Sequence, residues 1–80
     1  MKKIGLAASE PEVAERFGRR LQEAREREGI SQARLAEALD LDHSYISRLE
    51  SGARMPSVGL LLALRRRYGW SVDELLGVAS

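Results

Sequence analysis

Five short stretches of this chain carry apolar residues at helical spacing, and each is bounded by residues that typically begin or end helices. In the first stretch the apolar residues recur every three or four positions, as on one face of a helix: Val13, Phe17, Leu21 and Ala24. No segment alternates apolar and polar residues as a strand does, so the pattern predicts an all-α domain of five short helices. The expected starts are Glu10 with Pro11, Ser31, Asp42, Pro56 with Ser57, and Ser71, and the expected glycine ends are Gly29, Gly52 and Gly69.

Composition limits what such a helical domain can do. The chain has 80 residues, of which 44% are hydrophobic, and this suffices for one small domain. It has no cysteine and a single histidine, His43, so disulfide bonds, thiolate chemistry and metal sites built from several imidazoles are excluded, and we expect neither a metal nor a cofactor. The formal net charge of +1 is weak support for a polyanionic partner, so the distribution of charge has to decide.

Membrane insertion and secretion are not expected. The longest uncharged apolar run, residues 58–64, is far shorter than the ~20 residues of a membrane span. The apolar part of residues 1–9 is also shorter than the roughly 7–15 residues of a secretory signal. We therefore expect a cytoplasmic protein in which residues 1–9 form a loose N-terminal arm and residues 10–80 form one domain.

The third expected helix has a polar face of unusual composition. At about 100° per residue, Ile46 and Leu49 lie opposite a face of small polar side chains and one arginine. A merely solvated face more often carries Lys and Glu, whereas Ser and His hydrogen-bond closely to a partner and Arg can bind a guanine edge. Both interpretations, a solvated face and a binding face, remain open from this segment alone. The polar residues are His43, Ser44, Ser47, Arg48 and Ser51.

The second and third expected helices form a pair. Leu35 and Leu39 give the second helix an apolar face, and Ala36 between them is small enough for the close approach of two steeply crossing helices. This spacing is that of a helix-turn-helix, placed at about residues 32–51.

Five motifs, in this order and spacing, resemble those of the Cro/repressor (XRE-type) helix-turn-helix regulators, which have the lambda-repressor-like fold. The resemblance covers about residues 13–77. One departure is Asp40, which stands in the turn where the family usually has glycine; Asp tolerates the left-handed backbone conformation, so the departure leaves the function unaffected. The motifs are L-x-x-x-R-x-x-x-G-I-S-Q from Leu21, L-A-E-A-L at 35–39, Y-I-S-R-L-E-S-G at 45–52, R-M-P-S at 54–57 and S-V-D-E-L-L-G at 71–77.

The resemblance implies that the partner is double-stranded DNA and that residues 42–51 are the recognition helix of the major groove. The implied base contacts, which agree with the helical wheel, are His43, Ser44, Ser47 and Arg48. The implied phosphate contacts are Ser31, Gln32, Tyr45, Ser51 and Arg54. A phosphate contact is the alternative for Arg48, and a place at the edge of the core is the alternative for Tyr45. The resemblance also pairs Arg25 with Glu50 in a partly buried ion pair.

Surplus apolar residues near the C-terminus predict a homodimer. The leucines at 60, 61, 62 and 64 cannot all face inward from one helix. An exposed apolar cluster more often marks an interface than bare surface. The expected interface residues are Leu60, Trp70, Val72 and Leu76, with a place in the monomer core as the alternative for Trp70.

These observations favour a transcriptional regulator, most simply a repressor, that binds a palindromic operator in a bacterial or phage-derived system. An enzyme is not expected, because no metal cluster, cysteine or glycine-rich phosphate loop is present. The arginines at 65–67 suit the C-terminus of a helix better than a nucleic-acid patch. The alternative function is that of an antitoxin, which would bind a protein toxin and regulate its own operon.

Overall fold

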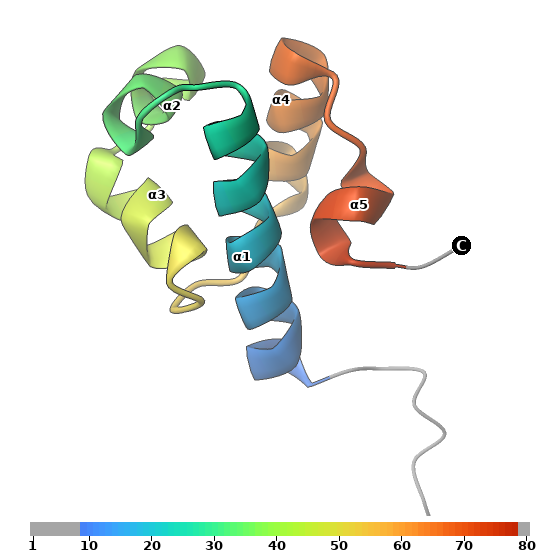
Figure 1. The fold of residues 1–80 in the computed structure, drawn as a ribbon. Helices are drawn as coiled ribbons and strands as arrows, with labels where there is room; N and C mark the ends of the chain where they lie inside the picture. Colours follow the sequence, from blue (N-terminus) through green and yellow to red (C-terminus); the bar gives the residue numbers. More distant parts are fainter. Residues whose placement is uncertain (1–8, 79–80) are drawn as a thin grey trace, which may run out of the picture.

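The structure of the chain, a computed structural model, describes residues 9–78. Five helices follow one another: α1 Glu10–Arg27, α2 Gln32–Leu39, α3 His43–Glu50, α4 Val58–Tyr68 and α5 Val72–Leu76. The segment 9–78 contains no strand, which confirms the predicted all-α, five-helix architecture. Figure 1 shows α1 through the middle of the molecule, with α2 and α3 to one side and α4 and α5 to the other. The predicted N-terminal arm lies outside the described residues except for Ser9.

Ser9 belongs to the helical domain and begins α1 with a capping box. Its hydroxyl accepts a hydrogen bond from the backbone N–H of Glu12, and the Glu12 carboxylate accepts one from the backbone N–H of Ser9 at 3.0 Å. The Ser9 hydroxyl also donates to the same carboxylate at 3.1 Å. The two bonds that the carboxylate accepts lower the pKa of Glu12, the one from the backbone N–H most strongly. The boundary predicted at Glu10 and Pro11 is correct, but the S-x-x-E signal one residue earlier was missed.

All three predicted serine caps are present. The hydroxyls of Ser31, Ser57 and Ser71 each accept a hydrogen bond from the backbone N–H three residues later. Asp42 occupies the N-cap position of α3, but its side chain makes no capping bond. Its carboxylate instead accepts a hydrogen bond from the hydroxyl of Ser44 at 3.1 Å. The predicted position of this cap is therefore right and the predicted bond is wrong.

The turn between α2 and α3 depends on Asp40, which has the left-handed conformation with φ 58° and ψ 45°. This conformation lets the N–H of Leu41 reach the carbonyl of Ala36 at 2.8 Å, which closes the last turn of α2 and redirects the chain. The prediction that Asp would take the place of glycine in this turn is confirmed.

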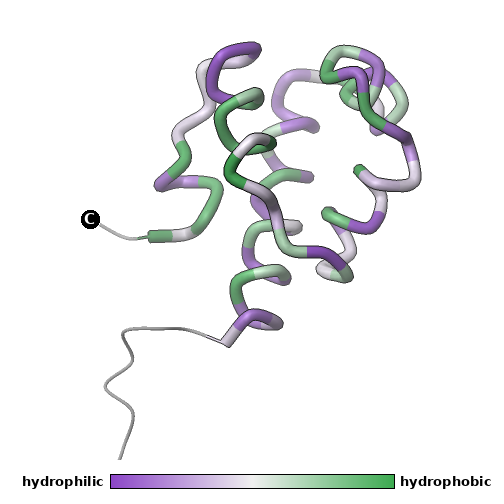
Figure 2. The backbone as a smooth tube through the Cα atoms, turned by 180° about the vertical axis from the view of Figure 1, so that it is seen from behind, coloured by the Kyte–Doolittle hydropathy of each residue, from purple (hydrophilic) through white to green (hydrophobic). Residues whose placement is uncertain are grey.

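All five helices contribute side chains to one core, in which α1 packs mainly against α3 and α5. The largest of its completely buried side chains are Phe17, Leu21, Leu35, Ile46, Leu49 and Leu64. Val13, predicted to face inward, is only half-buried, and the neighbouring Ala14 is buried instead. Hydrophobic and hydrophilic stretches alternate along the turns of α1, as expected for a helix that covers a core on one side (Figure 2).

Two of the four residues predicted for a dimer interface lie in this core. Leu60 is 5% exposed and Trp70 is 9% exposed, and the Trp70 ring stacks on that of Tyr68 at 4.6 Å. The prediction is wrong for Leu60, because the surrounding helices leave its side chain almost no exposed surface, and Trp70 takes the alternative place in the monomer core. Val72 and Leu76 are half-buried. The large apolar residues exposed within 9–78 are Met55, Val58, Leu62 and Val78.

Gly18 allows α1 to pack directly on the end of α3. A Cβ at this position would meet the backbone carbonyls of Leu49 and Glu50, the latter at 2.6 Å from its oxygen. Since these are backbone atoms, no side-chain movement could make room. The absent side chain of Gly18 therefore sets how closely α3 is held against the rest of the domain.

Candidate nucleic-acid interface

The helix α3 has one buried face and one exposed polar face. Ile46 and Leu49 are completely buried, and they attach the helix to α1 and α2. The four side chains predicted to contact bases are all exposed: His43, Ser44, Ser47 and Arg48. The fold thus brings them together at the surface, carried by a helix that is fixed from behind.

Arg25 and Glu50 form a bidentate ion pair between α1 and the end of α3. Arg25 donates from Nε to Glu50 Oε2 at 2.7 Å and from Nη2 to Oε1 at 3.1 Å. The Glu50 side chain is 4% exposed. The hydrogen bond to Glu50 raises the pKa of Arg25, and this effect exceeds the opposing effect of burial. A third bond, from Nη1 to the carbonyl of Ile30 at 2.8 Å, ties the same guanidinium to the loop before α2.

The ion pair continues into a polar network that the sequence did not reveal. Gln32 Nε2 donates to Glu50 Oε1 at 2.9 Å, and Gln32 Oε1 lies 3.1 Å from Nε2 of His43. Gln32 was predicted only as a phosphate contact, from its place at the start of α2. The amide has two N–H bonds, so the bond to Glu50 leaves one free to donate to a phosphate. The resemblance named Gln32, Glu50 and His43 separately, and only the crossing of α2 and α3 joins them.

The remaining predicted phosphate contacts lie at the ends of α2 and α3. Ser31 and Ser51 are exposed at the start of α2 and the end of α3, and the Ser51 hydroxyl donates to the carbonyl of Arg48 at 3.1 Å. The guanidinium of Arg54 lies over the ring of Tyr45, 5.4 Å from its centre. The Tyr45 ring packs against the core, in agreement with the alternative of a core-edge role, and its contact with Arg54 had no signal in the sequence.

A basic run outside this surface has a structural explanation. Residues 65–67 occupy the last turn of α4, where cations are favoured by the helix dipole. Arg67 also lies over the ring of Tyr68, 5.0 Å from its centre. This placement agrees with the interpretation of the run as a helix end.

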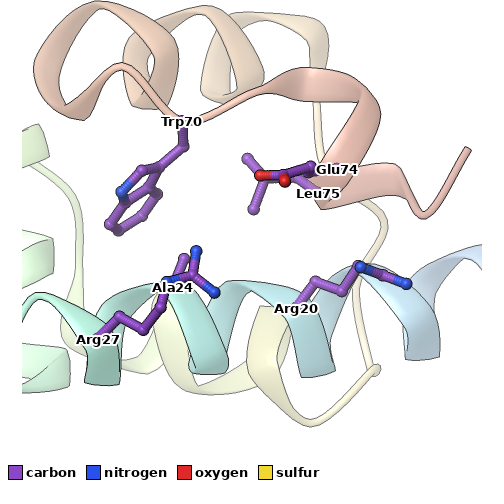
Figure 3. A pocket seen from close by; sticks show the side chains of 6 residues that line it. All are labelled: Arg20, Ala24, Arg27, Trp70, Glu74 and Leu75. Carbon is purple, nitrogen blue, oxygen red and sulfur yellow. The ribbon is translucent and has the colours of Figure 1, made fainter.

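The cavity between α1 and α5 is small. It has a volume of about 70 Å³ and is lined by Arg20 and Arg27 from one side and by Trp70 and Glu74 from the other, as Figure 3 shows. Known small-molecule sites usually have about 300–1,000 Å³, so this cavity is too small for a typical metabolite. Within residues 9–78, no three His, Cys, Asp or Glu side chains gather as metal ligands would. None of the helices described is both long and apolar enough to span a membrane.

Comparison with known proteins places the chain in a family. Residues 16–76 match the model of a helix-turn-helix domain. The HTH-type transcriptional regulator PuuR of Escherichia coli (strain K12) is 42% identical over 57 residues, which make up 71% of this chain and 31% of that protein. ImmR of Bacillus subtilis (strain 168), also an HTH-type transcriptional regulator, is 40% identical over 61 residues, or 76% of this chain and 48% of ImmR. The chain therefore spans less than half the length of these curated relatives.

A solved structure is similar along most of its length. The restriction-modification controller protein C.AhdI from Aeromonas hydrophila superimposes with a TM-score of 0.71 and 37% sequence identity, covering 78% of this chain and 94% of C.AhdI. The matched region includes the helix pair and the network behind it, because the family model spans residues 16–76. The chain thus belongs to the Cro/repressor-type (XRE) family of helix-turn-helix, DNA-binding transcriptional regulators.

Proposed function

We propose that this chain is a sequence-specific repressor of transcription that binds a palindromic operator as a homodimer, with α3 in the major groove. The observation that carries the proposal is the exposed polar face of α3, which is fixed from behind by two completely buried residues, Ile46 and Leu49. Short side chains on such a face let a helix approach base edges closely, and a rigid support keeps the same atoms in register at every site.

Each part of the surface has a distinct role in this proposal. Arg48 is the candidate for a guanine contact through two hydrogen bonds, and Ser44 and Ser47 for shorter contacts beside it. Ser31 and Gln32 at the start of α2 would bind phosphates, as would Ser51 and Arg54 just after α3. These contacts fix the orientation of the protein without reading sequence.

The homodimer is proposed to form through α4. Val58 is 72% exposed and Leu62 is 46% exposed, and the two lie one turn apart on this helix. An apolar groove of about 330 Å³ runs along the same helix, lined in part by Leu39, Leu41 and Ala63. Val58 and Leu62 form an apolar ridge beside this groove. In a dimer with two-fold symmetry, the ridge of each copy can pack into the groove of the other. Val72 and Leu76 remain candidates at the margin of this interface.

Selection of bound duplexes from random DNA at about 150 mM salt tests the proposal. We expect enrichment of a site with two-fold symmetry, and an affinity that falls steeply as salt rises, because bound phosphates release their counterions. A chain carrying Arg48→Ala, Ser44→Ala and Ser47→Ala together is the control and should lose the enrichment while keeping the fold. Failure of the parent chain to enrich any sequence over random DNA would refute the proposal.

A further inference from the structure

His43 is the first residue of α3 and is exposed on the face proposed to read bases. Its ring has two nitrogens, and Nε2 is already engaged, 3.1 Å from Oε1 of Gln32. What the ring offers to DNA therefore depends on Nδ1. If Nδ1 carries a hydrogen it donates, and if it carries none it accepts.

The orientation of the Gln32 amide is determined by Glu50. A carboxylate only accepts hydrogen bonds, so the group that faces Glu50 Oε1 at 2.9 Å has to be the NH₂ of Gln32. The reversed amide would place two oxygens against each other. Arg25 holds this carboxylate with two bonds of its own, at 2.7 and 3.1 Å, which prevents Glu50 from turning away. The Gln32 oxygen consequently faces His43.

This orientation determines where the neutral imidazole carries its hydrogen. An amide oxygen has no hydrogen to give, so the bond between Gln32 and His43 requires that Nε2 of His43 be the donor. A neutral imidazole has one N–H, and Nδ1 is then an acceptor. No hydrogen bond to Nδ1 is formed by any group within residues 9–78. The acceptor is available for an external donor.

We infer that the chain of bonds from Arg25 through Glu50 and Gln32 makes His43 a reader of bases that carry an exocyclic amino group, namely adenine or cytosine. In the major groove adenine N6 and cytosine N4 are donors, whereas guanine and thymine present only acceptors in addition to the thymine methyl group. The inference rests on the proposed function and assigns a class of base to one of its residues.

The hydrogen position can be measured without DNA. His43 is the single histidine of the chain, so the imidazole ¹⁵N signals belong to it without assignment. In long-range ¹H–¹⁵N spectra at pH 8 or above, we expect Nε2 to be the protonated nitrogen and Nδ1 the bare one. In Gln32→Leu the two shifts should converge, because the ring then exchanges between its two neutral forms. A protonated Nδ1 in the parent chain, or identical shifts in both proteins, would overturn the inference.

A matched control is available in α1. Gln22 also donates from its side-chain amide, to Glu26 at 3.1 Å on the exposed surface. Gln22→Leu makes the same chemical change away from His43 and should leave both ring shifts where they are in the parent chain. A Gln22→Leu spectrum that changes as the Gln32→Leu spectrum does would show a general effect of the substitution and would also overturn the inference.

The choice of base is then tested on a selected duplex at pH 8. His43→Ala should relax the preference at one base pair in each half-site, and the parent chain should prefer adenine or cytosine there. Replacement by guanine or thymine should lower the affinity of the parent chain roughly tenfold, and that of Gln32→Leu by clearly less. A preference for guanine or thymine, or no relaxed position, overturns the inference. If no duplex is enriched at all, the proposed function fails and the base assignment fails with it, while the ¹⁵N spectra still decide the hydrogen position.

Discussion

Arg48 lies exposed in the last turn of α3, and its neighbours on the same face are short. An arginine among serines is free to extend to a base edge, where the guanidinium matches the two acceptors of guanine. Arg54 differs, because its guanidinium already lies over the Tyr45 ring beyond the end of the helix. The two arginines therefore suit different tasks, reading and positioning.

Arg48→Ala should relax the preference at one base pair in each half-site and cost roughly 1–3 kcal/mol of binding free energy at the preferred sequence. Arg54→Ala should weaken binding to all sequences about equally, since a phosphate contact carries no sequence information. Affinity measurements on a panel of single-base variants of the selected site distinguish the two. Equal, sequence-blind losses from both substitutions would show that Arg48 contacts only phosphate.

Removal of one partner of the Arg25–Glu50 pair should destabilise the fold strongly. The remaining charge would be buried without its counter-ion, which costs about 3–5 kcal/mol when burial is complete. Arg25→Met and Glu50→Leu should each lower the free energy of unfolding by about 3 kcal/mol, and the double variant should recover part of that loss. Urea unfolding of the four proteins gives the coupling free energy. Strictly additive single losses would contradict a direct pairing.

At the scale of the helices, the position of α3 depends on a close approach to α1. Gly18 faces backbone carbonyls at the end of α3, and Glu50 in that same turn holds the polar network. A displacement of α3 would therefore shift the face proposed to read bases and the polar network together.

Gly18→Ala should lower the free energy of unfolding by about 1–3 kcal/mol, because the added methyl group overlaps backbone atoms that have no room to move. Gly59→Ala is the matched control. That glycine also lies inside a helix, but the nearest atom to an added Cβ is 3.9 Å away, so alanine should stabilise α4 by up to about 1 kcal/mol. Thermal unfolding at a concentration where the chain is monomeric compares them. A Gly18→Ala protein as stable as its parent would disprove the close packing.

At the scale of the whole molecule, one α3 helix contacts only a few base pairs. Two copies related by a two-fold axis double the length of DNA that is read, and the copies need an interface that does not disturb the core. Leu60 and Trp70 are unsuitable because the monomer buries them, whereas Val58 and Leu62 point outward from α4.

Leu62→Glu should therefore convert the proposed dimer into a monomer while leaving the helical content unchanged, because the residue is already 46% exposed. Burial of two carboxylates at a two-fold axis is unfavourable without cations beside them. Met55→Glu is the control: Met55 is another exposed apolar residue, 39% exposed and outside α4, and its substitution should leave the mass of the assembly in solution unchanged. Sedimentation equilibrium at micromolar concentration measures both. A parent chain that sediments as a monomer, or a Leu62→Glu chain that remains dimeric, would exclude this interface.

The sequence by itself determined the features that depend on neighbouring residues. The helix count, the three predicted serine caps and the left-handed turn at Asp40 follow from backbone conformations and from hydrogen bonds between residues at most five positions apart. Periodicity likewise identified Ile46 and Leu49 as the inner face of α3, because the opposite sides of one helix are set by its own geometry.

Only the tertiary structure decided what depends on the crossing of helices. Helical spacing identified a surplus of leucines in α4, but the packing of the other helices decides which of them are buried. Leu60, which lies beside Leu39 and Tyr45, is covered, while Leu62 is not. The link from Glu50 through Gln32 to His43 joins residues that are 18 and 11 positions apart, and no local pattern encodes it. Such contacts depend on the angle and distance between packed helices, which the whole core sets, and a single segment of sequence does not contain them.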